Sequence, residues 1–286
     1  MIGFFTRLPV PKTAKDGFTD ERYRKAVKLM PLVGLVIGAI LTAVKLILSF
    51  VEMPAFVDGA IILCVYIFIT GGLHFDGLSD TCDGVFSGRS REQSLEIMKD
   101  SRIGVFGTLG IFMAGLFYFV MFSNVPAACL IAVPVVGRAC CLISASFAPY
   151  ARKEAGMGSA TSREGGAASV ISAVISMVGV SFLIVPVYLI LLFLDARIPL
   201  NEIGVYFLFS SSEFFSGYKH CSLIICSLIA AGVAVLITLW MTERFRKKLG
   251  GVTGDTFGAV IEVSSLVYML FFFILYSQIG QHSGWL

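Results

Sequence analysis

Apolar runs of about 20 residues recur along this chain, and they limit its possible folds more than any other feature. A run of about that length is what an α-helix needs to cross a bilayer. Gly, Pro and isolated charges interrupt several runs, as is tolerated in helical bundles. The sequence therefore predicts an all-α, polytopic membrane bundle of about seven transmembrane helices, with six and eight as the alternatives. The predicted spans lie near 29–50, 54–73, 104–122, 125–147, 167–194, 222–241 and 256–279.

The composition leads to the same class of protein. Of the 286 residues, 57% are hydrophobic and 14% are charged, and the mean hydropathy is +0.87. Soluble domains are about one quarter charged, so an ordinary soluble domain is excluded. The seven cysteines lie mostly in apolar runs and form no C-x-x-C pair, so neither a disulfide framework nor a zinc site is expected. We treat 1–286 as a single transmembrane domain whose partner is the lipid bilayer and not a nucleic acid.

Lys and Arg residues indicate how the bundle is oriented. Most of the 22 basic residues fall in the segments 7–28, 89–102, 152–163 and 244–248. With seven spans these segments all lie on one side of the membrane, and the positive-inside bias predicts that this side is cytoplasmic. The N-terminal segment 1–28 would then be cytoplasmic and the C-terminus would be outside. Lys45, within the first predicted span, is expected to snorkel toward the interface, and the amphipathic connection 195–221 is expected to lie on it.

The stretch "GGLHFDGLSDTCDG", residues 71–84, follows the second predicted span directly. Asp76, Asp80 and Asp83 are spaced i, i+4 and i+7, so they would share one helix face if the second span continues past the membrane edge. Three carboxylates so close together repel, and a divalent cation such as Mg²⁺ or Mn²⁺ is the usual means of neutralising them. The alternative is a solvated acidic loop. We place this motif in a cytoplasmic, Asp-rich catalytic segment, 74–103.

The next polar stretch, "KDSRIGVFG" at 99–107, adds a fourth aspartate and two bases. Asp100 could complete a metal site, while Lys99 and Arg102 could bind phosphate oxygens. Ordinary juxtamembrane anchoring is the alternative for both bases. Neighbouring glycines would let a bulky anionic ligand approach the backbone closely.

Further candidate residues fall on the same predicted side. Arg138 lies inside a span, where an ionisable group marks either a function or a structural partner. Arg152 belongs to "YARKEAGMG", and Asp255 belongs to the Gly-rich turn "GGVTGDTFGAVIE" that opens the last span. Such a turn can offer backbone N–H groups to a phosphate, or it can simply start a helix. Glu262 would need a polar cavity, and His74 could be a base or merely a helix cap.

This inventory favours one reaction type. Carboxylates with a divalent metal, arginines and Gly-rich turns suit reactions on diphosphate esters, because a metal that bridges two phosphates eases the displacement of one of them. The sequence contains neither a G-x-S-x-G elbow nor a Cys/His pair. Direct attack by a hydroxyl group of the substrate is therefore favoured over a covalent enzyme intermediate.

Taken together, these motifs resemble the cobalamin synthase family of prokaryotic vitamin B12 assembly. The resembling stretches run from "FFTRLPVP" at 4–11 through the motifs quoted above to "GGVTGDTFGAVIE" at 250–262, which covers essentially the whole chain. The resemblance implies a Mg²⁺-dependent enzyme, with Mn²⁺ as the alternative metal, in the cell (inner) membrane and facing the cytoplasm. Its substrates would be adenosylcobinamide-GDP and α-ribazole or α-ribazole 5′-phosphate, and GMP would be released.

The resemblance also assigns roles to residues. Asp76, Asp80 and Asp83 would be metal ligands and, with Asp100, catalytic. Substrate-binding candidates are Arg7, His74, Lys99, Arg102, Arg138, Arg152, Asp255 and Glu262. One departure is Ser265, where an acid is expected three residues after Glu262, and it puts a catalytic role for that helix face in doubt. The sequence leaves a homo-oligomer open.

Three other functions are weighed against this one. CDP-alcohol phosphotransferases share the D-x-x-D-G spacing at 80–84, but Phe86 and Ser87 stand where their Ala-Arg pair would follow. An aspartate-rich membrane prenyltransferase would need a second D-x-x-x-D motif, which the chain lacks. A transporter or channel is disfavoured because the acids gather at one face and the Asp motif has no inverted repeat.

Overall fold

The computed structural model describes residues 2–9, 26–51, 53–152, 159, 161–162, 166–195 and 217–282. Its elements in these residues are helices, apart from an isolated bridge between Tyr150 and Val252. In chain order they are α1 (Ile2–Phe5), α3 (Met30–Ser49), α4 (Ala55–Thr70), α5 (Leu73–Phe86), α6 (Arg91–Ile97), α7 (Val105–Asn124), the 3₁₀ helix η1 (Ala127–Ile131), α8 (Val133–Phe147), α10 (Ala167–Asp195), α13 (Gly217–Leu249) and α14 (Gly254–His282). The predicted interfacial connection falls mostly on 196–216, outside the described residues.

Six of these segments are long and apolar enough to cross a membrane, and they confirm the all-α, multi-pass prediction. They are α3, α7, the η1–α8 segment, α10, α13 and α14. The bent pair of α4 and α5 would be a seventh span if it is counted as one. The predicted number of about seven therefore agrees with the structure when this pair is included.

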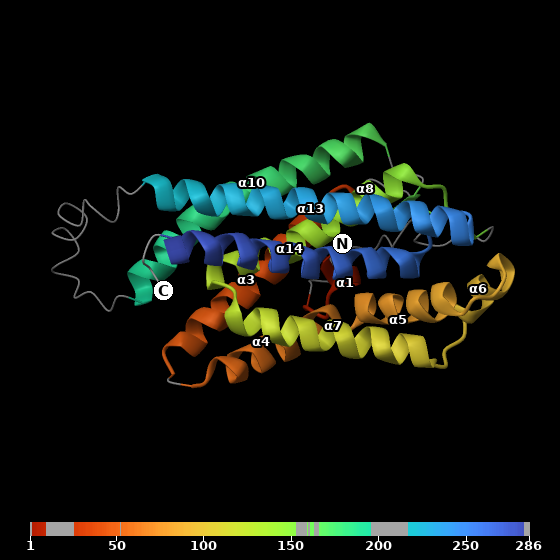
Figure 1. Ribbon diagram of the computed structural model, residues 1–286, viewed down its shortest axis with the longest axis horizontal. Coiled ribbons are helices and arrows are strands. Elements are labelled where there is room, and N and C mark those ends of the chain that lie inside the picture. Colours follow the sequence, from red (N-terminus) through yellow and green to blue (C-terminus); the bar gives the residue numbers. More distant parts are fainter. Residues whose placement is uncertain are drawn as a thin grey trace.

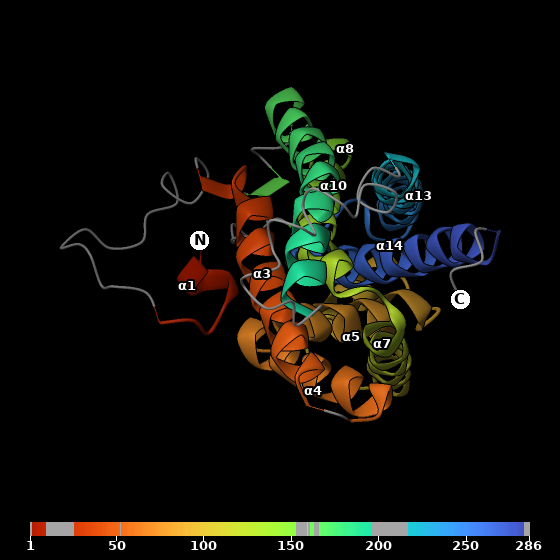
Figure 2. The same ribbon diagram turned by 90° about the vertical axis from the view of Figure 1, so that its left-hand side faces the viewer.

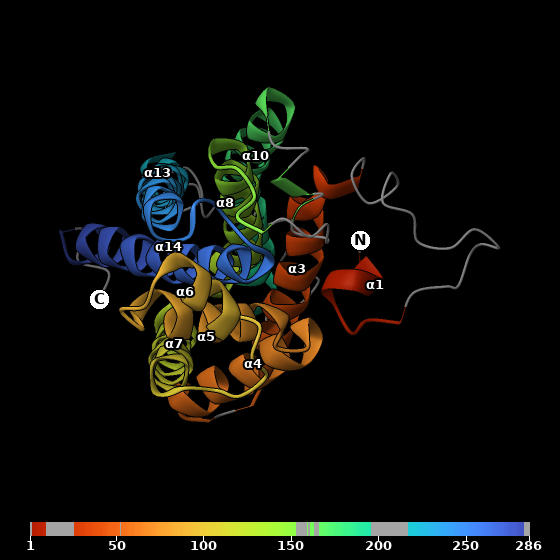
Figure 3. The same cartoon turned by 90° about the vertical axis from the view of Figure 1, so that its right-hand side faces the viewer.

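The helix α8 forms the centre of the bundle. It contacts α3, α10, α13 and α14, and nearly all of its side chains are buried. Viewed from the two ends, α3, α10 and α13 lie around α8, while α4, α5 and α7 form a second group (Figures 2 and 3). Because α14 contacts α5 and α7 as well as α8 and α13, it joins the two groups. In Figure 1, α5, α7, α13 and α14 run along the long axis of the molecule, with α6 at one end.

The chain bends sharply between α4 and α5. Gly71 and Gly72 have φ angles of +63° and +70°, a left-handed conformation that side-chain-bearing residues rarely adopt. These two residues turn the chain by 89°. The second span therefore does not continue straight through the Asp motif, which was the condition stated for a shared face, but Asp76, Asp80 and Asp83 do share a single helix, α5.

Lys45, which was expected to snorkel toward the interface, makes a specific contact with the end of α7. Its ammonium group donates hydrogen bonds of 2.6 Å to the carbonyl oxygen of Phe122 and 2.9 Å to that of Val125. These carbonyls lie at the C-terminal end of α7, where the last turn has no intrahelical donors and carries a partial negative charge. Lys45 thus joins α3 to the end of α7.

Candidate active site

The helices α5 and α14 cross in direct backbone contact at two glycines. A Cβ atom at Gly77 would lie 2.8 Å from the carbonyl oxygen of Asp255, and one at Gly258 would lie 2.9 Å from that of His74. Real side chains do not tolerate such distances, so glycine is needed on both helices for this approach. The crossing brings the Asp motif of α5 beside the first turn of α14, although about 180 residues separate the two in sequence.

Four carboxylates gather at this crossing. Asp76, Asp83 and Asp255 all act electrostatically on Asp80, and the nearby positive charge is that of Arg152. Asp76 is exposed, whereas Asp80, Asp83 and Asp255 are partly buried. The predicted grouping of Asp76, Asp80 and Asp83 is thus observed, and the structure adds Asp255 to it.

Arg152 forms an ion pair with Asp255, with 2.7 Å between its Nη2 and the Oδ2 atom. The short backbone pairing between residues 149–151 and Val252 brings the two side chains together. In it, Ala151 N–H donates to Val252 O at 2.8 Å and Val252 N–H donates to Pro149 O at 2.9 Å. The neighbouring Tyr150 is half-buried, and this burial raises the pKa of its hydroxyl. The two sequence motifs that contain Arg152 and Asp255 therefore form one structural unit.

The Gly-rich turn before α14 has two uses. Gly250 and Gly251 serve internal packing, because Gly250 lies against the Arg91 guanidinium and Gly251 against the carbonyl group of Pro149. Gly254 differs, since a Cβ atom there would meet nothing within 4 Å. Thr253 and Thr256 cap the start of α14. The Thr253 backbone N–H donates to the Thr256 hydroxyl at 2.8 Å, and the Thr256 backbone N–H donates to the Thr253 hydroxyl at 3.2 Å. Open space at Gly254 is consistent with a ligand at the N-terminus of α14.

Asp83 has a specific structural partner in α7. Its two carboxylate oxygens accept hydrogen bonds from the backbone N–H groups of Gly104, at 2.7 Å, and Gly107, at 2.8 Å. A Cβ atom at either glycine would collide with this carboxylate. The motif "RIGVFG" is thus explained by helix capping, in which a negative charge satisfies free N–H groups at a helix N-terminus.

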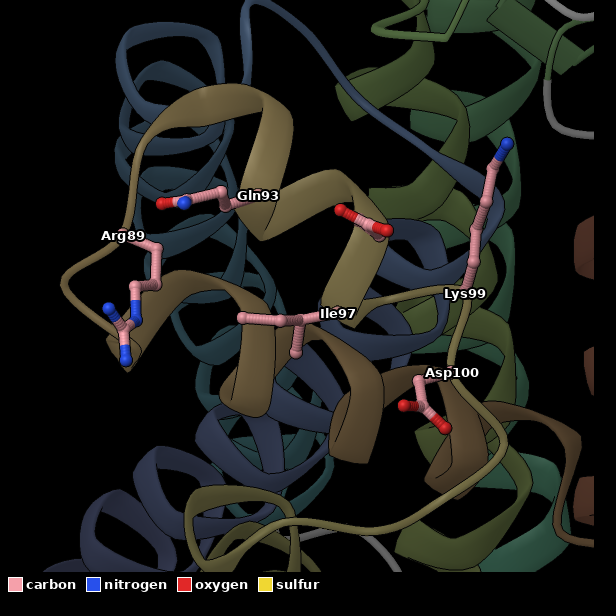
Figure 4. Close-up of a pocket in the computed structure, with 6 residues that line it drawn as sticks. Arg89, Gln93, Ile97, Lys99 and Asp100 are labelled. Carbon is pink, nitrogen blue, oxygen red and sulfur yellow. The ribbon is translucent and has the colours of Figure 1, made fainter.

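Asp100 lies in the loop between α6 and α7 and pairs locally with Arg102. The Arg102 guanidinium and backbone N–H both donate to it, with a closest distance of 2.6 Å. These hydrogen bonds lower the pKa of Asp100 to about 2, well below its ordinary value. With Lys99 it lines an open hollow of about 530 Å³ against α6, and the two side chains point in opposite directions (Figure 4). The side chain of Asp100 therefore has a partner of its own in Arg102.

Arg138, His74 and Glu262 come together in the interior of the bundle. Arg138 and Glu262 have no exposed surface, and His74 is 4% exposed. Tyr66 and Tyr118 donate to the Glu262 carboxylate, and neither tyrosine was singled out from the sequence. The only available signal was a tyrosine within an apolar span, whose hydroxyl needs a partner.

Two further arginines bind the segments that carry the site. Arg91 donates to Leu249 O at 2.8 Å and to Ala151 O at 3.2 Å, so it joins α6 to the end of α13 and to the segment that carries Arg152. The sequence had shown Arg91 only as one member of a basic cluster. Arg7 lies at the α4–α5 bend, where its backbone N–H donates to Ile69 O at 2.7 Å and its side chain packs against Gly71.

Comparison with known proteins identifies the family. A family model described as cobalamin-5-phosphate synthase matches residues 1–273. The chain belongs to this family. It is 36% identical to the adenosylcobinamide-GDP ribazoletransferase of Alkaliphilus oremlandii over 285 residues, which cover 98% of this chain and 97% of the relative. It is 35% identical to the protein of that name from Acetivibrio thermocellus, with 96% of both chains covered.

A more distant relative of the same name is found in Escherichia coli, at 31% identity over 94% of this chain and 96% of the relative. No solved structure matches the chain. The family resemblance drawn from the motifs is thereby confirmed, and this member of the cobalamin-5-phosphate synthase family is an enzyme, a transferase with several membrane-spanning helices.

Proposed function

We propose that this enzyme joins adenosylcobinamide-GDP to α-ribazole, or to α-ribazole 5′-phosphate, and releases GMP. The product would be adenosylcobalamin or its 5′-phosphate. The α5–α14 crossing carries the proposal, because it brings four carboxylates and Arg152 into one partly exposed site. The printed name of the relatives supplies the substrate class.

We propose that Mg²⁺ is required and that Asp76 and Asp80 hold it, with Asp83 and Asp255 alongside. Within the described residues, no three His, Cys, Asp or Glu side chains are arranged as a metal site. Mg²⁺ is usually bound through one or two carboxylates together with substrate phosphates and water. Mn²⁺ has similar ligand preferences and would substitute for it. When bound, the ion would neutralise charge on the diphosphate.

The residues around the acids then have separate tasks in the transfer. A hydroxyl oxygen of the ribazole attacks the phosphorus next to cobinamide, the bond from that phosphorus to the bridging oxygen breaks, and GMP departs with that oxygen. Arg152 offers planar N–H donors to phosphate oxygens, and Arg7, Lys99 and Arg102 are exposed bases for the same anion. Asp76, exposed in the first turn of α5, would accept the proton of the attacking hydroxyl on the carboxylate oxygen that does not hold the ion.

We also propose that the site faces the cytoplasm across the inner membrane of a prokaryotic cell. The observation that supports this is the meeting of three basic segments at one end of the bundle. Arg91 donates to the carbonyls of Leu249 and Ala151, and Lys248 donates to that of Arg89 at 2.7 Å. Basic loops gathered at one end are typical of the cytoplasmic side. Cysteine-accessibility labelling within 85–98 tests this, because periplasmic labelling would overturn the assignment.

GMP release by detergent-solubilised enzyme, supplied with adenosylcobinamide-GDP, α-ribazole 5′-phosphate and Mg²⁺, tests the reaction. Asp80→Asn should abolish turnover while the thermal unfolding temperature stays near that of the wild type. Wild-type-like turnover in this variant would disprove the proposed metal ligand. Running the same protein with a CDP-activated lipid separates the proposed reaction from that of a CDP-alcohol phosphotransferase, whose signature the chain matches only at D-x-x-D-G.

A further inference from the structure

Five polar side chains, one from each of five helices, meet inside the apolar bundle. This buried polar cluster consists of Tyr66 of α4, His74 of α5, Tyr118 of α7, Arg138 of α8 and Glu262 of α14. We propose that the cluster sets the position of α5 against α14, so that its members are positioning residues for the transfer. The inference rests on the proposed function, since it concerns the geometry of the same acidic site.

Glu262 joins α14 to two helices of the second group. Its Oε2 accepts a hydrogen bond of 2.6 Å from the Tyr118 hydroxyl, and its Oε1 accepts one of 3.0 Å from the Tyr66 hydroxyl. Both tyrosines are fully buried. A carboxylate within an apolar interior requires such partners, because an unpaired polar group there is costly. The two hydroxyls therefore hold Glu262, and with it α14, in a defined place.

Arg138 joins α8 to α5. Its Nη1 donates to Pro134 O at 3.1 Å, and its Nη2 lies 3.4 Å from His74 Nε2. A guanidinium has only donors, so the imidazole Nε2 is the acceptor in this contact. Arg138 also interacts electrostatically with Glu262. The positive charge of α8 thus lies between the helix that carries the Asp motif and the helix that carries Asp255.

The cluster and the acidic site occupy the same stretches of helix. His74 is two residues before Asp76, and Glu262 is two turns after Asp255. Gly258, which lies between Asp255 and Glu262 on α14, packs against the carbonyl group of His74. Because a helix moves as a rigid unit over such short distances, a shift at Glu262 displaces Asp255 relative to Asp76 and Asp80. Arg138 and Glu262 have no exposed surface, so they act in this arrangement through helix position and not by touching the substrate.

A matched control lies further along α14. The hydroxyl of Tyr268 is also fully buried and lies 2.8 Å from Ser227 Oγ, which in turn lies 2.8 Å from Ser181 Oγ. That chain joins α14 to α13 and α10, at a different part of the bundle from the contact with α5. Tyr268→Phe and Tyr118→Phe each remove a single buried hydroxyl without leaving a large cavity. Tyr118→Phe should reduce stability more, because its hydroxyl bonds a carboxylate, so kcat is compared where both variants are folded.

The experiment compares kcat and KM for GMP release in the full-length enzyme carrying Tyr118→Phe or Tyr268→Phe, at a temperature where both are folded. We expect Tyr118→Phe to lower kcat about tenfold, and Tyr268→Phe to leave kcat within about twofold of wild type, because small misplacements of catalytic groups slow the reaction strongly. The KM for adenosylcobinamide-GDP should change little in either variant, since no cluster member touches substrate.

Charge removal provides a second measurement. Glu262→Gln leaves the charge of Arg138 buried and without its counter-charge, which is strongly destabilising. The double variant Arg138→Met with Glu262→Gln should therefore recover thermal stability relative to Glu262→Gln alone, while its kcat stays low because the contacts of both positioning residues are lost. If the wild-type enzyme releases GMP and the two variants Tyr118→Phe and Tyr268→Phe have equal kcat, the inference is overturned while the proposed function stands. A wild-type protein that releases no GMP would overturn the proposed function and the inference with it.

Discussion

Replacing Gly258 with alanine tests whether the α5–α14 crossing creates the active site. The new Cβ atom would lie 2.9 Å from the His74 carbonyl oxygen and 3.2 Å from the Gly77 Cα atom, whereas ordinary contact begins at 3.4 Å. Both neighbours are backbone, so neither can rotate away. The helices must therefore separate locally by about 0.5 Å to restore ordinary contact.

Two effects on stability oppose one another in this variant. Overpacking of a core typically destabilises a protein by about 1–3 kcal/mol, but alanine is about 1 kcal/mol more favourable than glycine within a helix. The net loss should be about 0–2 kcal/mol, which is small. Activity is more sensitive, because a misplacement of about 1 Å can slow a reaction about 100-fold. A shift of half that size should reduce kcat about tenfold.

The assay is GMP release by protein in detergent, together with the thermal unfolding temperature. Gly232→Ala in α13 is the matched control, because its Cβ atom would meet nothing within 4 Å. This control should keep wild-type kcat and gain slightly in stability. Wild-type kcat in Gly258→Ala would refute the argument, since it would mean that the separation of α5 and α14 does not determine the reaction rate.

Three further variants test single contacts. Lys45→Met should lower the free energy of unfolding by about 1–3 kcal/mol while KM stays unchanged, because it leaves the last carbonyls of α7 without a donor; an unchanged melting temperature would contradict this. Asp83→Asn should destabilise the protein by about 1 kcal/mol, unlike Asp80→Asn, because it weakens the cap on α7; thermal melts of the two variants compare them directly. Arg91→Gln should raise the KM for the GDP-linked substrate several-fold, because it releases the segment that carries Arg152. Arg89→Gln is the control and should leave KM unchanged, since Arg89 binds Lys248 through its backbone carbonyl. Equal KM values in the two variants would exclude this role for Arg91.

The sequence by itself determined the membrane class, the helical spans and the acidic face. Apolar runs of span length are a local property, and so are the basic segments between them. The i, i+4, i+7 spacing likewise depends only on the α5 helix, which is why Asp76, Asp80 and Asp83 do share it. The family resemblance rested on short motifs of the same kind and was confirmed over residues 1–273.

Only the tertiary structure decided which distant residues meet. Nothing in the sequence indicates that the glycines of α5 and α14 lie against one another, because this contact depends on the packing of two whole helices. The same holds for the tyrosine partners of Glu262 and for Lys45, whose amino group binds carbonyl oxygens at the end of α7. A buried polar group takes whichever partner the fold brings within hydrogen-bonding distance, and that partner is chosen by three-dimensional packing and not by spacing along the chain.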